Sequence, residues 1–403
     1  MLGFFFVVQG LWAALHVYVS WRLIGVSSLG CSQPDSRTQT PRTWTRWLLY
    51  VLMAVLACTT PSVFFADQLF EAQSALIFRW VAWTYIGGFT TLFALLLVRD
   101  LGWLALGALD RLRARRGKDA LLPSSPERRR FLLNATGTAA VGVTTAVTAW
   151  GAHQARMPPE VVEVEVPIEG LPRELDGYHI VQLSDIHVGE TIDQTFIIPI
   201  VETVTSLAPD LIALTGDLVD GSVDKLRADI SPLGYLRARD GILFVTGNHE
   251  YYSGAAAWCE RFRELGLTVL INQHMLIKRG SAKLLLAGVT DLREGKSVPG
   301  HTSDPKLAIA DAPEHDLRIL LAHQPRSAHE ASKHGYALQL SGHTHGGQFF
   351  PWNLLIGLVQ PLGSGLGKID GMWVYVNRGT CYWGPPNRAG VPAEITSLRL
   401  RRA

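Results

Sequence analysis

The chain has 403 residues, of which 48% are apolar and only 18% charged, and its mean hydropathy is +0.16. This composition excludes a disordered or collagen-like chain and argues against a fully soluble protein. Residues 1–159 hold 15 basic and 7 acidic side chains, or +8, whereas residues 160–403 hold 22 and 28, or −6. The division indicates a basic membrane region and a mildly acidic water-soluble domain. The net negative charge of that domain argues against nucleic acid as a partner.

Four stretches before residue 152 are long and apolar enough to cross a membrane. Each runs for 19 or 20 residues without Lys, Arg, Asp or Glu, which as a helix spans the roughly 30 Å hydrocarbon layer. The fourth is the least hydrophobic, and a buried soluble helix is the alternative for it. We predict an anchor region of about four transmembrane helices in residues 1–151, at 2–21, 47–66, 80–98 and 131–150.

The connections between these stretches predict the orientation. The connections 22–46 and 99–130 are strongly basic, whereas 67–79 holds two acids and one arginine. The positive-inside rule places basic connections in the cytoplasm. We therefore expect a multi-pass protein of the cytoplasmic membrane, with the domain that follows on the extracytoplasmic side.

Residues 128–132, with the sequence RRRFL, resemble a twin-arginine export signal, which directs the export of folded proteins. Such signals usually begin a chain, and this one is internal. A plain positive-inside stop explains the arginines equally well, and in either case we expect an uncleaved anchor.

The four cysteines, Cys31, Cys58, Cys259 and Cys381, form no C-x-x-C pair, so a thiolate zinc site is not indicated. Cys259 and Cys381 share the second part of the chain. Unrelated thiols are favoured over a disulfide between them.

After a linker at 152–159, residues 160–403 alternate short apolar runs with amphipathic stretches, which predicts a layered α/β domain. An edge strand is expected at 161–168, where apolar and acidic residues alternate. Helices are expected at 196–207 and 255–265. Further strands are expected at 178–183, 211–214, 242–245, 283–287, 317–321, 337–340 and 373–376.

Polar residues recur where five of these strands end, and strand ends of this kind line the ligand crevice of an α/β sheet. Their Asp, His and Asn side chains, without Cys, suit Mn, Fe or Zn. The residues are Asp185, His187, Asp217, Asn248, His249, His323, His343 and His345.

In chain order these ends read Asp-x-His, Gly-Asp, Gly-Asn-His-Glu, a lone His and Gly-His-x-His. This series, between residues 177 and 399, resembles the calcineurin-like metallophosphoesterase superfamily, which implies an αββα sandwich. The start Ser-Asp-Ile-His-Val-Gly, the Gly-Gly-Gln after the last motif and the membrane anchor are similar to the exported, membrane-anchored branch with twin-arginine-type signals.

The resemblance implies a catalytic centre with two divalent metal ions (Mn, Fe or Zn), a hydroxide between them as nucleophile, and His249 as the catalytic proton donor or transition-state stabiliser. Seven residues are the implied metal ligands. They are Asp185, His187 and His345 for the first ion, Asn248, His323 and His343 for the second, and Asp217 as the bridge.

The function implied is hydrolysis of a phosphate ester. Tethering to a bilayer favours a phosphodiester of a lipid or cell-envelope intermediate over a small soluble ester, and no protein partner is evident. A phosphomonoesterase is one alternative. Another is a transporter or sensor with an accessory metal domain, which the single ionisable side chain in the spans, His16, disfavours.

Other residues near the motifs carry weaker expectations. Glu250 is expected to orient the ligands. Four charged residues are either phosphate contacts or solvated surface charges: Asp291, Arg293, Arg378 and Arg388.

The segment 349–359, directly after the last motif, is almost wholly apolar. It either folds onto the domain's own core or forms an apolar lip that touches the bilayer or a lipid chain. An aromatic rim beside it would consist of Tyr251, Tyr252, Tyr382 and Trp383.

Overall fold

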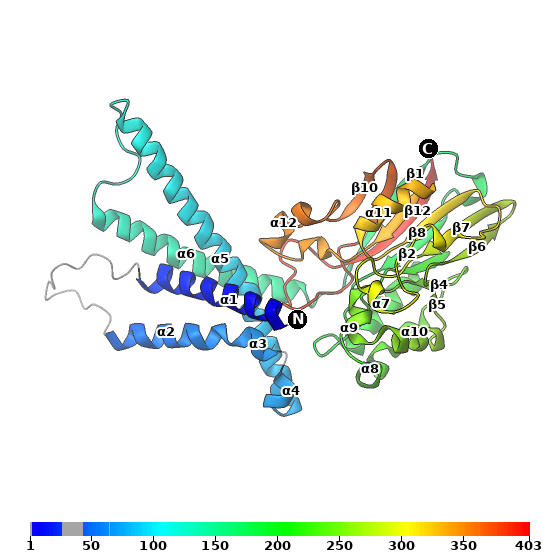
Figure 1. The fold of residues 1–403 in the computed structure, drawn as a ribbon, viewed down its shortest axis with the longest axis horizontal. Helices are drawn as coiled ribbons and strands as arrows, with labels where there is room; N and C mark the ends of the chain where they lie inside the picture. Colours follow the sequence, from blue (N-terminus) through cyan, green and yellow to red (C-terminus); the bar gives the residue numbers. More distant parts are fainter. Residues whose placement is uncertain (1, 26–42, 64) are drawn as a thin grey trace. The chain divides into compact units, whose positions relative to one another are not determined.

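A computed structural model describes residues 2–25, 43–63 and 65–403 (Figure 1). The chain forms two compact units, Met1–Trp150 and Gly151–Ala403. Cys31 lies outside the described residues.

The described part of the first unit is mostly helical, as the long apolar runs predict, and residues 115–125 form a non-helical connection. Among residues whose side chains are described, three stretches are long and apolar enough to cross a membrane: Arg46–Val63 and parts of α5 and α6. The span expected at 2–21 is a helix, but the side chains of residues 2–6 are not described, so its membrane role stays a prediction. The helices are α1 (Leu2–Ser20), a π-helical turn (Trp21–Gly25), α2 (Thr43–Ala57), α3 (Thr59–Val63), α4 (Ala66–Leu69), α5 (Ala72–Ala114) and α6 (Pro126–Gln154).

The helices differ from the expected spans at several boundaries, and α5 and α6 are longer than expected at both ends. The apolar stretch at 47–66 is interrupted after Ala57, because Pro61 lacks an amide hydrogen and its ring clashes with the carbonyl four residues earlier. The third helix does not end near residue 98 but continues to Ala114. Charged residues end an apolar run without ending a helix, and Arg111 and Arg113 suit the negative end of the helix dipole.

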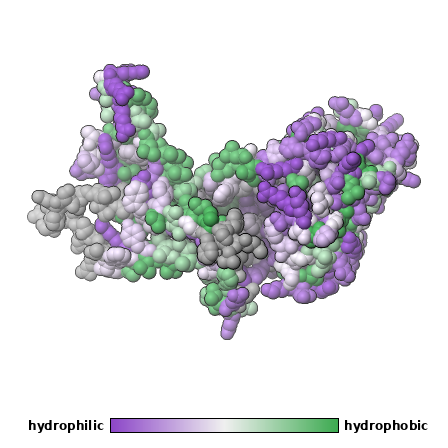
Figure 2. All heavy atoms as spheres, in the orientation of Figure 1, coloured by the Kyte–Doolittle hydropathy of each residue, from purple (hydrophilic) through white to green (hydrophobic). Residues whose placement is uncertain are grey.

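The extended α5 also brings a charged group into the helical unit. Asp100 is only 6% exposed and lies 2.9 Å from a guanidinium nitrogen of Arg99. It also pairs with Arg22 and accepts a 2.6 Å hydrogen bond from the hydroxyl of Tyr18. The carboxylate is thus neutralised by its neighbours, whereas large apolar side chains elsewhere in the unit point outward, as the green surfaces of Figure 2 show.

The second unit is a sandwich of two mixed sheets with six strands each. The first sheet has the order β1-β12-β2-β3-β4-β5 and the second the order β10-β11-β9-β8-β7-β6. The strands of the first are β1 (Glu160–Ile168), β2 (His179–Leu183), β3 (Leu211–Leu214), β4 (Ile242–Phe244), β5 (Thr268–Val269) and β12 (Glu394–Arg402). Those of the second are β6 (Gln273–Arg279), β7 (Ala282–Gly288), β8 (Leu317–Leu321), β9 (Leu338–Ser341), β10 (Gly365–Ile369) and β11 (Met372–Val376).

The expected strands are all present, and β1 is an edge strand as the alternating pattern predicted. Four strands were not expected: β5, β6, β10 and β12. Among them, β12 lies between β1 and β2, parallel to the first and antiparallel to the second. The interior strands β2, β3 and β4 run parallel, as do β7, β8, β9 and β11, so within each sheet these strands end at a common edge.

The core lies between the sheets. Its fully buried members include Leu243 and Leu398 of the first sheet and Leu284 and Leu340 of the second. Each such side chain contributes roughly 1.5–3 kcal/mol by burial. The helices of this unit are α7 (Gln194–Ser206), α8 (Val223–Ile230), α9 (Asn248–Ser253), α10 (Ala255–Glu264), α11 (Ala328–Ala331) and α12 (Trp352–Val359).

Candidate metal centre

The eight site residues predicted from the sequence all lie just beyond strand ends of the two sheets. Polar side chains are tolerated there because the loops, unlike the strands, face a crevice rather than the apolar core. Asp185 and His187 follow β2, Asp217 follows β3, Asn248 and His249 begin α9 after β4, His323 follows β8, and His343 and His345 follow β9.

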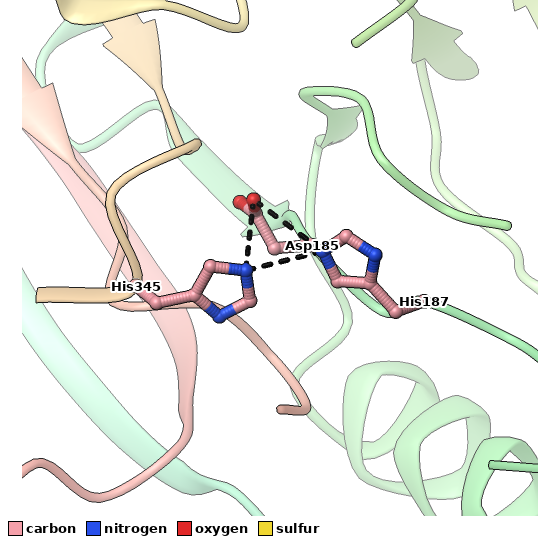
Figure 3. A group of neighbouring side chains, drawn as sticks. All are labelled: Asp185, His187 and His345. Atoms are coloured by element: carbon pink, nitrogen blue, oxygen red, sulfur yellow. Dashed lines mark hydrogen bonds and ion pairs between the residues drawn. The ribbon is translucent and has the colours of Figure 1, made fainter. Parts of the chain in front are cut away.

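Asp185, His187 and His345 form a first group of neighbouring ligand atoms (Figure 3). The Nε2 atoms of the two histidines lie 3.1 Å apart, and Nε2 of His345 lies 3.4 Å from Oδ1 of Asp185. All three residues are less than 9% exposed. Two nitrogens and a carboxylate oxygen therefore face one buried point.

Asp217, His323 and His343 form a second group. Nε2 of His323 lies 3.0 Å from Oδ2 of Asp217 and 3.2 Å from Nδ1 of His343. The same Nδ1 lies 3.1 Å from Oδ1 of Asn248, which adds a fourth member. Each of the seven predicted ligands thus belongs to one of two groups.

Asp217 connects the groups, because a ligand atom of its side chain also lies within 4.8 Å of ligand atoms of His187 and His249. Its Oδ1 accepts a 2.8 Å hydrogen bond from the backbone N–H of His249. Asp217 is only 2% exposed, and its carboxylate lies near members of both groups.

The backbone at these strand ends is strained. Five predicted ligands have positive φ angles between 51° and 72°, a region costly for residues with a Cβ atom. Hydrogen bonds between neighbouring loops hold the conformation: the N–H of Asp185 donates to Gly216 and that of His187 donates to Asp217. The five residues are Asp185, His187, Asp217, His343 and His345.

Two glycines bring the loops into close approach. A Cβ on Gly247 would lie 2.2 Å from Oδ1 of Asp217, and one on Gly342 would lie 2.1 Å from Oδ2 of Asp185. Because neither distance is sterically possible, only glycine lets each carboxylate reach its position.

The tautomers of the histidines fit a bound cation. Nδ1 of His323 lies 2.8 Å from the carbonyl oxygen of Thr215 and donates to it, so in the neutral ring the lone pair is on Nε2. That lone pair faces the carboxylate of Asp217. Burial lowers the pKa of His323, but the charge and hydrogen bond of Asp217 outweigh burial and hold it well above 6.5. The position therefore favours a positive charge, which a divalent metal ion supplies as well as a proton does.

Asp220 is a site residue that the sequence analysis missed. Its Oδ1 lies 3.2 Å from Nδ1 of His187 and also accepts a hydrogen bond from Nδ1 of His249. Burial lowers the pKa of His249, but the hydrogen bond to Asp220 and the charges of Asp217 and Asp220 raise it to about 9, which favours the protonated ring. The spacing of Asp217 and Asp220, three residues apart after a strand, was the available signal.

Glu250 was expected to orient the ligands, and it does so by binding backbone N–H groups of the site loops rather than ligand side chains. Its carboxylate accepts hydrogen bonds from the N–H groups of Asp217, Leu218 and Gly247 at 2.7–3.0 Å. Fully buried, it joins the loop after β3 to the loop after β4.

Of the four charged residues considered as phosphate contacts, three have partners within the protein and one is exposed. Asp291 is buried rather than solvated, and its carboxylate accepts a 2.8 Å hydrogen bond from the side chain of Gln324. Arg293 is exposed. Arg378 pairs with Glu394 at 2.6 Å, and buried Arg388 donates to the backbone carbonyl of Arg378.

The cysteines and the aromatic residues are also placed. Cys259 and Cys381 are both buried free thiols. Of the expected rim, Tyr252 and Trp383 are exposed and their rings each lie 5.3 Å from that of His249. The other two have partners elsewhere: the Tyr251 hydroxyl lies 2.9 Å from a ring nitrogen of His301, and that of Tyr382 donates to the Thr191 carbonyl.

Comparison with known proteins agrees with this geometry. Residues 178–347 match the family described as calcineurin-like phosphoesterase. A Bos taurus protein described as "Transmembrane protein with metallophosphoesterase domain" is 36% identical over 376 residues, which cover 88% of this chain and 80% of the bovine protein. The chain belongs to the calcineurin-like phosphoesterase family.

Two further family members show how the similarity is distributed. A Danio rerio protein with the same description is 39% identical over 270 residues, and the match spans 62% of its length. The Bacillus subtilis metallophosphoesterase YkuE is 30% identical over 285 residues, which cover 97% of YkuE and 68% of this chain. The present protein is therefore a metallophosphoesterase with transmembrane segments, and its His/Asp clusters are consistent with the metal site typical of the family.

Proposed function

We propose that this metallophosphoesterase hydrolyses a phosphodiester of a lipid or cell-envelope intermediate at a dinuclear metal centre. The observation that carries the proposal is the meeting of two ligand groups at Asp217. One ion needs about four ligands, and the seven residues supply two such sets if that carboxylate is shared.

Two divalent ions held by these residues would neutralise the phosphate charge and make hydroxide available near neutral pH. The chain itself supplies the proton. His249, protonated and oriented by Asp220, donates its proton to the leaving-group oxygen as the ester bond breaks. Tyr252 and Trp383 enclose the ring on its exposed side.

The arginines support a diester over a monoester. A monoester carries a second negative charge, which phosphate sites usually meet with a further arginine. Of the three candidate arginines, Arg378 pairs with Glu394, and buried Arg388 donates to backbone carbonyl groups and lies 3.1 Å from Nδ1 of His345. Only Arg293 is left exposed. A phosphomonoesterase remains the alternative within the same chemistry.

The arginine-rich connections support placing the catalytic domain on the extracytoplasmic face. A reporter that is active only in the cytoplasm, fused after Ala403, should be silent, and activity there would overturn this placement. Export through the twin-arginine route is a separate proposal. Replacing Arg128 and Arg129 by Lys should then block export, and normal export of that variant would reject the route.

The test of activity uses the full chain in detergent with bis(p-nitrophenyl) phosphate and p-nitrophenyl phosphate. We expect metal-dependent turnover that favours the diester, and His249→Ala should lower it by roughly 10²–10⁴ with metal content unchanged. Equal rates of diester hydrolysis by wild type and His249→Ala would refute the assignment. A complete lack of turnover on a wider ester panel would favour the transporter or sensor alternative.

A further inference from the structure

Helix α12 is an apolar helix without a buried face. None of its eight residues is buried, and the side chains of Leu354 and Leu358 are 70% and 81% exposed. In the fully described range 151–403, five of the twelve exposed large apolar side chains lie in this one helix. Figure 2 shows the segment as a green patch against a mostly purple domain surface. A stable soluble surface would not keep such a patch uncovered.

The sequence around α12 lacks charge altogether. Residues 349–367 contain no Asp, Glu, Lys or Arg, although charged side chains make up 18% of the chain. Interfaces between proteins usually carry a polar, solvent-accessible rim. An uncharged helix with an exposed tryptophan at its first residue, Trp352, is instead suited to the boundary between headgroups and acyl chains.

The helix is fixed rigidly to the loop that carries His343 and His345. A Cβ on Gly347 would lie 2.4 Å from the Cα atom of Asn353, so the loop and the first turn of α12 are in backbone contact. Beyond the helix, the carbonyl of Gly363 accepts a 2.6 Å hydrogen bond from the hydroxyl of Thr344, which lies between the two histidines. Both ends of the α12 segment are thus tied to the metal-ligand loop.

We propose that α12 inserts into the surface of the lipid bilayer that holds the chain. The bilayer is within reach because only residues 155–159 separate α6, a candidate membrane span, from β1. The charge at the end of the helix is also complementary: the exposed guanidinium of Arg326 donates to the carbonyl of Val359, where it can meet a lipid phosphate.

Insertion at α12 places the metal-ligand loop at the level of the lipid headgroups. A phosphoester within a headgroup then reaches His249 without the lipid leaving the membrane. The insertion of α12 does not depend on the proposed function. The access of a lipid phosphoester to His249 does rest on the proposed function.

The test measures the surroundings of α12 in the full chain, reconstituted in phosphatidylcholine vesicles with and without phosphatidylglycerol. A nitroxide spin label is attached at Leu358→Cys, in a background where Cys31 and Cys58 are replaced by Ser. The matched control is Leu307→Cys, which replaces another exposed leucine of the same domain. Collisions with oxygen, which concentrates in lipid, and with a water-soluble nickel chelate report the depth of each label.

We expect the label at position 358 to be accessible to oxygen and protected from nickel, and the label at position 307 to show the reverse. Equal nickel access at both positions would overturn the proposal. Protection of position 358 from both reagents would also overturn it, because a protein contact, with the helical unit or with a second copy, would then cover α12.

Hydrolysis assays distinguish this inference from the proposed function. The pair Leu354→Ser and Leu358→Ser should lower hydrolysis of a vesicle-embedded phosphodiester at least about tenfold and change bis(p-nitrophenyl) phosphate hydrolysis less than about twofold. Equal rates on the embedded ester would reject the link between α12 and the substrate. Lipid exposure of position 358 without any hydrolysis by wild type would reject the proposed function and leave the inserted helix in place.

Discussion

Nδ1 of His249 donates its hydrogen to the carboxylate of Asp220, which leaves Nε2 of the ring available to a substrate. The same carboxylate lies beside Nδ1 of His187, a predicted metal ligand. One acid therefore orients both a proton donor and a ligand, and this coupling makes Asp220 the most informative position outside the predicted set.

Replacing Asp220 by Asn should lower kcat by about 10–100-fold, because the amide lacks the negative charge and keeps only one acceptor oxygen, so it fixes the tautomers of the two rings less firmly. Asp220→Glu should recover part of the loss. Steady-state kinetics with a soluble diester measure the effect, and Asp224→Asn, at an exposed acid of α8, is the matched control. Wild-type kcat in the Asn variant would show that neither histidine needs this carboxylate.

Replacing Asp217 by Asn should remove more metal than any other single ligand change, because its carboxylate lies near His187 of the first group as well as near His323 and His343 of its own group. Elemental analysis of purified protein should give up to two ions per chain for wild type, fewer for Asp185→Asn and fewest for Asp217→Asn. A chelator should abolish activity, and Mn, Fe or Zn should restore it. Full metal content in Asp217→Asn would contradict the shared carboxylate.

Gly247→Ala should behave like a ligand variant although no ligand is changed. The new methyl group would lie 2.2 Å from Oδ1 of Asp217 and must displace either the carboxylate or the loop. We expect loss of metal together with at least about a tenfold loss of activity. Gly357→Ala in α12 is the control, since no atom lies within 4 Å of its added methyl group and helical alanine is favoured by about 1 kcal/mol.

Acid should destabilise the protein partly through His179, which lies in β2 away from the metal centre. Burial, together with the charge of Arg399, lowers the pKa of His179 below 6.5 in the folded chain. The unfolded chain then binds the extra proton as pH falls through 6.5, so this histidine's contribution to stability is present above that pH and lost below it.

His179→Gln removes this titration and keeps a side chain able to bond to Ser397, whose hydroxyl lies 2.9 Å from the histidine ring. Between about pH 7.5 and about pH 5.5, the unfolding temperature should fall further for wild type than for the variant. Scanning calorimetry of both proteins in detergent makes the comparison. Parallel decreases would show that His179 does not contribute.

The candidate ligand residues stand out in the sequence because each motif is short and follows an apolar run, and the structure brings them together in neighbouring groups. Asp185 and Asp217 end strands that are buried on both faces, so their polarity stands out from the surrounding pattern. Asp220 was missed because it lies within a loop, where an acid is ordinary. Its role exists only once β2, β3 and β4 are placed side by side.

The sequence was less informative where contacts with distant residues determine the pairing or the burial of a segment. The pairing of β12 between β1 and β2 joins distant parts of the chain, and no local pattern encodes that order. The apolar segment 349–359 was compatible with both a core and a surface position. The structure places it as exposed α12, held there by contacts of Gly347 and Thr344 that lie outside the segment.

The position of β12 determines when the first sheet can be completed during protein synthesis. The ribosome makes β1 directly after α6 and makes β12 after every other strand, yet β1 pairs with β12 alone in its sheet. The first sheet is therefore completed only when residues 394–402 have emerged, by which time the helical segments have long been available for membrane insertion. The catalytic domain therefore completes its fold late in synthesis. Deleting residues 394–402 would leave β1 without a neighbouring strand.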